Sequence, residues 1–410
     1  MPQGIIIIGG VAGGMSAATR LRRLDESAII TVFEQGAYTG FANCGITYAL
    51  GKVIEHDEEL ILRTPDDFKH VRTGGDDCIR QFGYDKLILA QGAKALRPSC
   101  AGTELDNIAT MQTIADLQKV HDLLSHYHAK HICVIGAGFI GIEVAENLRR
   151  LGLDVSIVEY GSHVFPPIDG EMAEILHSEV RNNGIQLFLN ESAQKIDKSQ
   201  VILSSGCVLP ADLVILTAGV RARTGLARQA GLVLGATGVS VNTHMQTSDP
   251  DIYAVGDMVE TQNNIMVKPA MLALAGPANR QGRMAADHIC GKAVNYHGNV
   301  GTSVCRVFGL TLGFVGLSTQ VLALNAWKIY RQDEDGKPLQ LVEVVQGCRG
   351  LIIWGENDRS FRIRSPLLGD YLKREVFGTD YDKRWVTASP RYLSSEIFAN
   401  GACISSAALK

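Results

Sequence analysis

One local pattern occurs twice in the chain, and it constrains the fold more than any other feature. An apolar run at residues 5–8 leads into the turn Gly9-Gly10-Val11-Ala12-Gly13-Gly14, and a second run at 131–135 leads into Gly136-Ala137-Gly138-Phe139-Ile140-Gly141. A helix-length segment follows each turn, and a further apolar run then ends in an acid, Glu34 or Glu159. Each pattern predicts a βαβ unit, so the chain is predicted to be an α/β protein with two Rossmann-like units.

The residue types of each unit suit a dinucleotide. The first glycine allows a tight turn, and the later small residues let the backbone approach a pyrophosphate and the helix pack closely on the strand. The pyrophosphate is expected at the helix N-terminus, where free N–H groups and the helix dipole favour negative charge. Glu34 and Glu159 are expected to accept hydrogen bonds from a ribose diol. Val11 stands at a position where the general motif has glycine.

Composition gives no reason to expect a polyanionic partner. The 410 residues include 39 Lys and Arg against 43 Asp and Glu, so neither nucleic acid nor an anionic membrane surface is predicted as a partner. The nine cysteines contain no Cys-x-x-Cys pair and no zinc-like cluster, so no metal site is predicted and a reduced thiol inventory is expected. The apolar run near the N-terminus is too short for a signal or a membrane span, which favours a soluble cytoplasmic protein.

Three further segments are predicted to be strands that end in turns of small residues. Residues 84–93 and 211–220 have this form, with Ala90 and Gly92 in the first turn and Gly219 in the second. They are predicted to close the first and second nucleotide units. Residues 252–257 form another apolar run, which ends in Gly256 and Asp257. An acid at this place can accept hydrogen bonds from a polyol chain, as the ribityl hydroxyls of a flavin require.

Cys44 is the candidate for redox chemistry. It follows a polar turn after the first unit, at or near the predicted start of a short helix. Such a position lowers a thiol pKa through the helix dipole and makes the thiolate a nucleophile. A dithiol site would need a second cysteine close by, but position 49 is Ala49 and the next cysteine is Cys78. Cys44 is therefore expected to work without a neighbouring cysteine, through a mixed disulfide, a persulfide or a sulfenic acid.

Taken together, these segments resemble the pyridine nucleotide-disulfide oxidoreductases. Within that family the chain is similar to the single-cysteine branch of coenzyme A-disulfide reductases and NAD(P)H-dependent polysulfide or persulfide reductases, in which Val11 is usual. The matching segments are Ile7–Gly14, Phe41–Gly45, Gly138–Glu143, Ile252–Asp257 and Leu274–Gly282.

The resemblance implies bound FAD, with NADH or NADPH as the hydride donor and Cys44 as the catalytic residue. It implies that the FAD is held by Gly9, Gly10, Val11, Ala12, Gly13, Gly14, Glu34, Asn43, Ala90, Gly92, Gly256, Asp257, Ala270, Ala275 and Gly276. It implies that the nicotinamide cofactor is held by Gly136, Gly138, Phe139, Ile140, Gly141, Glu159 and Gly219. Glu159 suits the free 2′-hydroxyl of NADH and repels a 2′-phosphate, so NADH is favoured.

The substrate implied by the resemblance is a small disulfide or polysulfide, coenzyme A disulfide among them. The matching coenzyme A positions are Ser16, Arg20, Arg23 and Asn43. Arg20 and Arg23 are three residues apart, so they share a helix face on which a phosphate could be bound.

The family also implies a domain organisation of the glutathione reductase type. An FAD domain is expected from 1–108 and 232–298, an NAD(P)H domain from 109–231, and a C-terminal α+β interface domain from 299–410 that would form a homodimer. Two departures are noted. The β-meander of the FAD domain is shortened near residues 70–83, and the family pattern fades beyond about Leu324, with an irregular tail from Trp385.

Three functions remain open at this stage. The first is reduction of coenzyme A disulfide, polysulfide or persulfide. The second is an NADH oxidase or peroxidase in which Cys44 cycles as a sulfenic acid. The third is a degenerate, non-catalytic paralogue that retains nucleotide binding, which the shortened FAD domain and the divergent tail suggest.

Overall fold

The computed structural model describes residues 2–62, 71–73, 81–263, 268–299, 301–315, 332–334, 337–343 and 349–356. A first parallel sheet contains the N-terminus and has the order β16-β4-β1-β2-β3. Its strands are β1 (Gly4–Ile8), β2 (Ile29–Glu34), β3 (Val71–Thr73), β4 (Lys86–Leu89) and β16 (Ile252–Ala254). The late strand β16 therefore completes a sheet begun by the first ninety residues.

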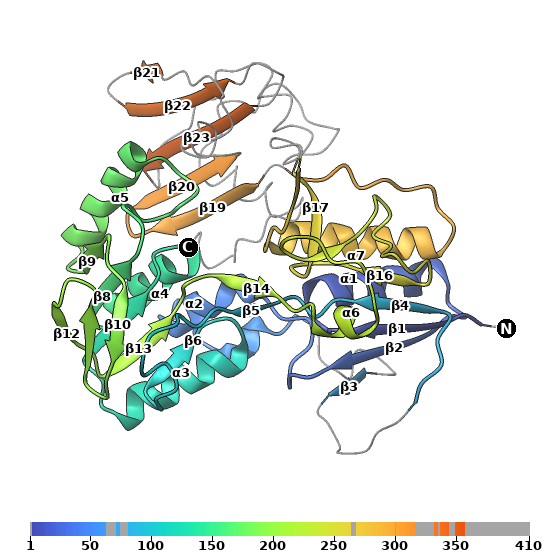
Figure 1. The fold of residues 1–410 in the computed structure, drawn as a ribbon, viewed down its shortest axis with the longest axis horizontal. Coiled ribbons are helices and arrows are strands. Elements are labelled where there is room, and N and C mark those ends of the chain that lie inside the picture. The colour runs from blue at the N-terminus through green and yellow to red at the C-terminus, as the bar shows by residue number, and fades with distance from the viewer. Residues whose placement is uncertain are drawn as a thin grey trace.

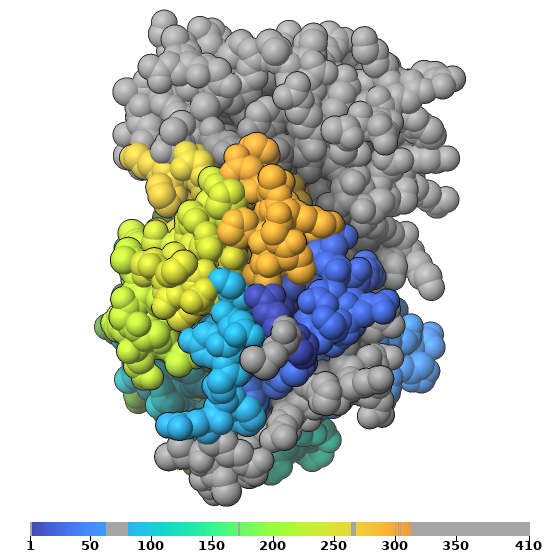
Figure 2. Space-filling view, turned by 90° about the vertical axis from the view of Figure 1, so that its right-hand side faces the viewer, coloured from blue at the N-terminus to red at the C-terminus, as the bar shows by residue number. Residues whose placement is uncertain are grey.

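Helices α1 (Ala12–Leu24) and α7 (Ala275–Ile289) pack against each other beside this sheet (Figure 1). In Figure 2 the blue segment near the N-terminus and the orange segment toward residue 299 lie side by side. The packing is close because it is built from small residues. A Cβ added to Gly282 of α7 would lie 2.2 Å from the carbonyl oxygen of Gly13 in α1.

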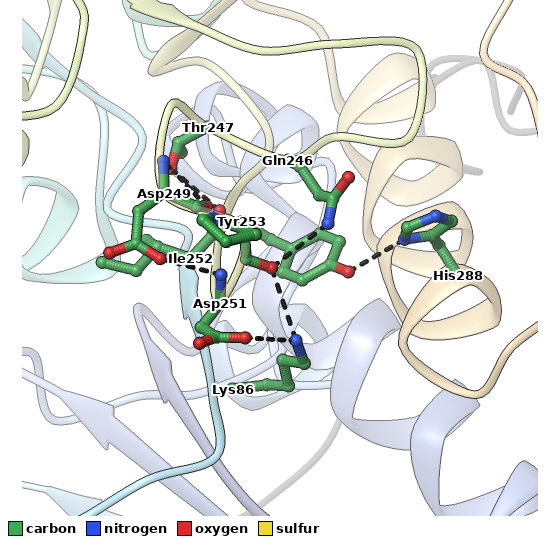
Figure 3. Close-up of polar contacts among 9 residues, drawn as sticks. Lys86, Gln246, Thr247, Asp249, Asp251, Ile252, Tyr253 and His288 are labelled. Atoms are coloured by element: carbon green, nitrogen blue, oxygen red, sulfur yellow. Dashed lines mark hydrogen bonds and ion pairs between the residues drawn. The ribbon is translucent and has the colours of Figure 1, made fainter.

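Polar contacts hold the edge strand β16 in place (Figure 3). Lys86 of β4 forms an ion pair with Asp251, which immediately precedes β16. The hydroxyl of buried Tyr253 lies 2.8 Å from Nδ1 of His288 in α7, and the His288 ring stacks on His244. These contacts fix β16 between β4 and α7, and so fix the turn that follows β16 at Gly256 and Asp257.

A second parallel sheet repeats the design, in the order β6-β13-β7-β8-β9. Its strands are β6 (Ile108–Thr110), β7 (His131–Ile135), β8 (Asp154–Glu159), β9 (Gln186–Leu189) and β13 (Leu213–Leu216). Strands β7 and β13 are almost wholly buried, as an apolar run without alternation predicts for a central parallel strand. The helices that belong to it are α3 (Ile114–His126), α4 (Phe139–Arg150) and α5 (Gly170–Asn182).

Smaller elements complete the two halves. A three-stranded antiparallel sheet follows β9 and is made of β10 (Ala193–Ile196), β11 (Gln200–Leu203) and β12 (Val208–Pro210). Strand β5 (Ala93–Ala95) follows β4 of the first sheet, and β14 (Val220–Ala222) follows β13 of the second sheet. These two strands pair antiparallel with each other. The remaining elements are η1 (Asn43–Gly45), α2 (Ile46–Leu50), η2 (Asp57–Leu60), α6 (Gly225–Gln229), β15 (Val239–Ser240), β17 (Val259–Asn263) and β18 (Lys268–Ala270).

The C-terminal part forms an antiparallel sheet that lies above the second half in Figure 1, in the order β19-β20-β23-β22-β21. Its strands are β19 (Thr302–Val307), β20 (Leu310–Val315), β21 (Gln332–Glu334), β22 (Lys337–Glu343) and β23 (Arg349–Glu356). The β19–β20 turn is bonded to the second half, because Phe308 N–H donates to Glu146 at 2.7 Å and Gly309 N–H donates to Glu179 at 2.9 Å.

The predicted α/β class with two Rossmann-like parallel sheets is confirmed. The predicted domain limits remain predictions. Within the shortened segment at 70–83, the described residues comprise β3 and residues 81–83, which form no strand. The predicted irregular tail from Trp385 lies outside the described residues. None of the described helices is long and apolar enough to cross a lipid bilayer.

We expect Gly282→Ala to destabilise the protein by about 1–3 kcal/mol, because the added methyl group would overlap the α1 backbone. Gly225→Ala is the matched control, since a Cβ at Gly225 meets no atom within 4 Å. The control should be neutral or stabilising by up to about 1 kcal/mol. Urea unfolding of both variants measures the difference. Equal stability of the two would contradict the close α1–α7 packing.

Candidate functional site

A single cavity of about 1160 Å³ is lined by residues of both Rossmann-like halves. Its wall contains most of the predicted site residues: Gly9, Val11, Ala12, Gly13, Glu34, Asn43, Cys44, Ala90, Gly92, Gly136, Gly138, Phe139, Ile140, Glu159, Gly219, Gly256, Asp257, Ala275 and Gly276. Residues from far apart in the sequence meet here because parallel strands end at the same edge of their sheet. Predicted residues outside this lining are Gly10, Gly14, Gly141, Ala270, Ser16, Arg20 and Arg23.

The first glycine turn is held by backbone contacts. Gly9 has φ +109°, and its N–H donates to the carbonyl of Phe33 at 2.8 Å. A Cβ on Gly14 would lie 1.8 Å from the carbonyl oxygen of Gly9, so glycine is required there. The Glu34 carboxylate accepts from the N–H of Gly10 at 2.6 Å and of Gly36 at 2.7 Å. Glu34 thus fixes the turn while it lines the cavity.

The second turn has the same construction. Gly136 has φ +107°, and a Cβ on Gly141 would lie 1.9 Å from the carbonyl oxygen of Gly136. The Glu159 carboxylate accepts from the N–H of Ala137 at 2.6 Å and of Gly161 at 2.7 Å. The two glycine turns therefore have the same backbone construction, and these turns, here called the cradles, open onto one cavity.

Several features of the cavity wall fit bound dinucleotides. Gly92 and Gly138 have no atom within 4 Å of the position that a Cβ would take, so both leave open space. The side-chain oxygen of Gln91, another lining residue, is buried without a hydrogen-bond partner. Burial raises the pKa of Asp257 to about 6. A hydroxyl-rich ligand would satisfy both of these acceptors.

Cys44 lies in η1, directly before the short helix α2, as predicted. It lines the cavity. The expectation that it has no cysteine partner is wrong for this structure, in which Cys44 is disulfide-bonded. Five other cysteines of the described residues are free, namely Cys100, Cys133, Cys207, Cys290 and Cys305. The spacing argument excluded a partner inside the same helix, but sequence distance sets no limit on a pairing across the fold.

The predicted coenzyme A residues are partly engaged within the protein. The Ser16 hydroxyl donates to Asn279 at 2.9 Å. The Arg20 guanidinium binds Asp287 through Nε at 2.9 Å and through a terminal nitrogen at 2.7 Å. Arg23 is exposed one turn further along α1, and Asn43 is exposed at the cavity wall. Their role in substrate binding remains a prediction.

Sequence reasoning assigned no role to Glu143, which also lines the cavity. This α4 residue accepts a hydrogen bond from the Thr47 hydroxyl at 2.9 Å and from the Tyr48 hydroxyl at 3.4 Å. Burial raises its pKa to about 7, and the nearby Glu146 adds to the rise. A detectable signal existed, because Glu143 and Glu146 are acids inside an otherwise apolar helix segment.

Comparison with known proteins identifies a family that the chain matches. The family model described as pyridine nucleotide-disulphide oxidoreductase matches residues 3–282. An NADH oxidase of Methanocaldococcus jannaschii is 31% identical over 339 residues, which cover 76% of each protein. A coenzyme A disulfide reductase of Staphylococcus haemolyticus is 31% identical over 343 residues, which cover 78% of this chain and 77% of that protein. The crystal structure of reduced Bacillus anthracis CoADR-RHD superposes with a TM-score of 0.84 at 32% identity, covering 98% of this chain and 80% of that one.

We expect Asp257→Asn to stabilise the ligand-free protein at pH 8. The folded-state pKa lies above that of an exposed Asp, so the destabilising effect of the buried charge grows as the pH rises from about 4 to about 6 and persists above that. The variant should unfold at a higher temperature than the wild type at pH 8 and at a similar temperature near pH 3.5. Calorimetry at the two pH values measures this. A stabilisation that is equal at both pH values would contradict the assignment to the buried charge.

Proposed function

The chain belongs to the pyridine nucleotide-disulphide oxidoreductase family, and is an enzyme of that class. On this premise we propose that it is an FAD-dependent reductase that uses NADH to reduce a small disulfide, polysulfide or persulfide, coenzyme A disulfide among them, through Cys44. One observation carries the proposal. A single cavity brings together two dinucleotide turns, the acid Asp257 and the redox-active candidate Cys44.

The first turn and its neighbours suit FAD. The pyrophosphate would rest on the N-terminus of α1, the ribose on Glu34 and the ribityl chain on Asp257. The backbone at Ala275 and Gly276 would lie along the flavin ring. When bound, the flavin accepts a hydride from NADH and passes two electrons to a disulfide.

The second turn suits NADH. The N-terminus of α4 would hold the pyrophosphate, and Glu159 would hold the adenosine ribose. The open space above Gly138 supports this placement. Glu159 favours NADH over NADPH, because its charge repels a 2′-phosphate.

Cys44 would carry the sulfur chemistry. Two electrons from NADH would first reduce the disulfide that Cys44 forms in this structure. The freed Cys44 thiolate would then attack one sulfur of a substrate R–S–S–R, which forms a mixed disulfide and releases R–S⁻ with the bonding electron pair. Two electrons from NADH then cleave the mixed disulfide and regenerate the thiolate. Ser16, Arg20, Arg23 and Asn43 would bind a coenzyme A substrate, and a homodimer would be the functional form.

A second function is an NADH oxidase or peroxidase, and the 31% identity to the archaeal NADH oxidase favours keeping it. The two activities separate in one assay of the purified protein. NADH oxidation that depends on added coenzyme A disulfide or polysulfide supports the reductase. Oxygen or peroxide consumption without any disulfide supports the oxidase. A colourless protein that binds no flavin would support a non-catalytic paralogue and remove both enzymes.

We expect Cys44→Ser to abolish NADH-dependent disulfide reduction, because serine cannot form a mixed disulfide. Flavin bleaching by NADH under anaerobic conditions should persist, since hydride transfer does not use the thiol. Cys207→Ser, at an exposed free cysteine, is the control and should keep full turnover. Disulfide turnover by Cys44→Ser at the wild-type rate would remove the assignment.

We expect Glu159→Ala to weaken NADH binding about 10- to 100-fold, the effect of losing a hydrogen bond to a charged group. The preference for NADH over NADPH should shrink in parallel. Steady-state kinetics with both nucleotides measure this. Glu34→Ala is the matched variant in the other cradle, and it should release FAD rather than raise the KM for NADH. An unchanged ratio of NADH to NADPH efficiency in Glu159→Ala would refute the role of Glu159.

A further inference from the structure

His177 of α5 is a buried histidine with a defined proton position. Its side chain is 1% exposed, and its Nε2 accepts a hydrogen bond from the backbone N–H of Val164 at 3.1 Å. A backbone N–H can only donate, so Nε2 carries no proton and the neutral ring has its proton on Nδ1. Nδ1 lies 3.3 Å from Oε1 of Glu174, one turn earlier in α5. The structure therefore uses His177 as an acceptor for one backbone group.

That backbone group belongs to the loop of residues 160–169, which joins β8 to α5 and is here called the β8–α5 loop. The loop begins directly after Glu159, the acid of the second glycine turn. Tyr160 and Pro166 of the loop line the cavity, as Glu159 does. Val164 lies between these two residues and is wholly buried. Its bond to His177 thus fixes the middle of a loop whose other residues face the cavity.

The residue after Val164 connects the loop to the second glycine turn. The N–H of Phe165 donates to the carbonyl of Ala137 at 2.9 Å. The buried Phe165 ring packs edge to face on Phe139, the first residue of α4, with 4.4 Å between ring centroids. Phe165 has φ +59°, a conformation that a bulky residue rarely adopts, so the contacts around it must hold it there. The His177 bond to the preceding residue is one of those contacts.

The surroundings of His177 agree with a neutral ring. Burial lowers the pKa of His177, and Arg181 on α5 and His163 on the β8–α5 loop act in the same direction. Glu174 opposes them, but it is largely exposed. A protonated ring would direct a second N–H at the N–H of Val164 and would break the contact.

We propose that His177 is a positioning residue for the nicotinamide dinucleotide, a role that rests on the proposed function. It holds Val164, and through Phe165 it sets how the β8–α5 loop lies against the second glycine turn. Without an acceptor at this place, a buried N–H would lose its partner, and the loop would move to regain one. Such a movement would displace Tyr160 and Pro166 from the cavity wall beside Glu159, where the adenosine end of NADH is proposed to bind.

Two substitutions of equal length test this role. His177→Met fills the site but offers only a weak thioether acceptor, whereas His177→Gln keeps a strong one. We expect His177→Met to raise the KM and the Kd for NADH about 10-fold, the effect of losing one hydrogen bond. Its kcat at saturating NADH and its FAD content should stay at the wild-type level. His177→Gln should restore the NADH affinity.

Titration of the FAD-loaded proteins with NADH gives the Kd, and steady-state kinetics separate KM from kcat. Wild-type NADH affinity in His177→Met would overturn the proposal. An equal loss of affinity in the Met and Gln variants would also overturn it, because the role assigned to His177 is that of an acceptor. Should the Met variant fail to fold, His177→Asn replaces it, since its shorter amide cannot reach Val164, and the same results are expected.

A second readout does not depend on activity or on NADH. Hydrogen exchange at the amides of Val164 and Phe165 should be slow in the wild type and in His177→Gln, and faster in His177→Met. Equal exchange in all three proteins would overturn the proposal. A wild-type protein that binds no NADH would overturn the proposed function instead, and the exchange rates would still report whether His177 holds the loop.

Discussion

The close approach of backbone to backbone at the two glycine turns is the constraint on which the rest of the structure depends. The carbonyl oxygens of Gly9 and Gly136 occupy the space that a Cβ on Gly14 or Gly141 would need. This contact brings the first turn of each helix down onto the end of its strand. The helix N-termini, and with them the free N–H groups, therefore face the shared cavity. A larger residue at either position would overlap that carbonyl oxygen and move the helix away from its strand.

The cysteine segment connects the two cradles because it is buried in the core of the opposite half. Phe41, Ile46 and Leu50 follow the first sheet in sequence, but they pack in one apolar cluster with residues of the second sheet and with Leu312 of the C-terminal sheet. Cys44 is consequently held in the cavity onto which both glycine turns open.

How much the sequence could predict depends on whether the information is local. Strand, turn and helix around Gly9 and Gly136, and the placement of Glu34 and Glu159, follow from residues within about thirty positions of one another, and all appear as predicted. The cysteine pairing and the contact of Glu143 with Thr47 are long-range, because they join segments whose separation in sequence carries no geometric information. The Arg20 ion pair with Asp287 is a similar case, since 267 residues separate its members. Local sequence patterns were therefore enough to predict the two glycine turns. The contacts between distant segments could be found only from the folded structure.

Buried acids in this cavity work against stability, which argues that their positions serve binding and chemistry. Asp257 and Glu143 both have pKa values raised by burial, so keeping either one charged costs folding free energy above its own pKa. Glu34 and Glu159 differ, because each accepts two backbone N–H bonds that compensate their burial. The cavity thus holds two kinds of acid. Glu34 and Glu159 accept backbone N–H bonds and shape the turns, whereas burial destabilises the charged forms of Asp257 and Glu143.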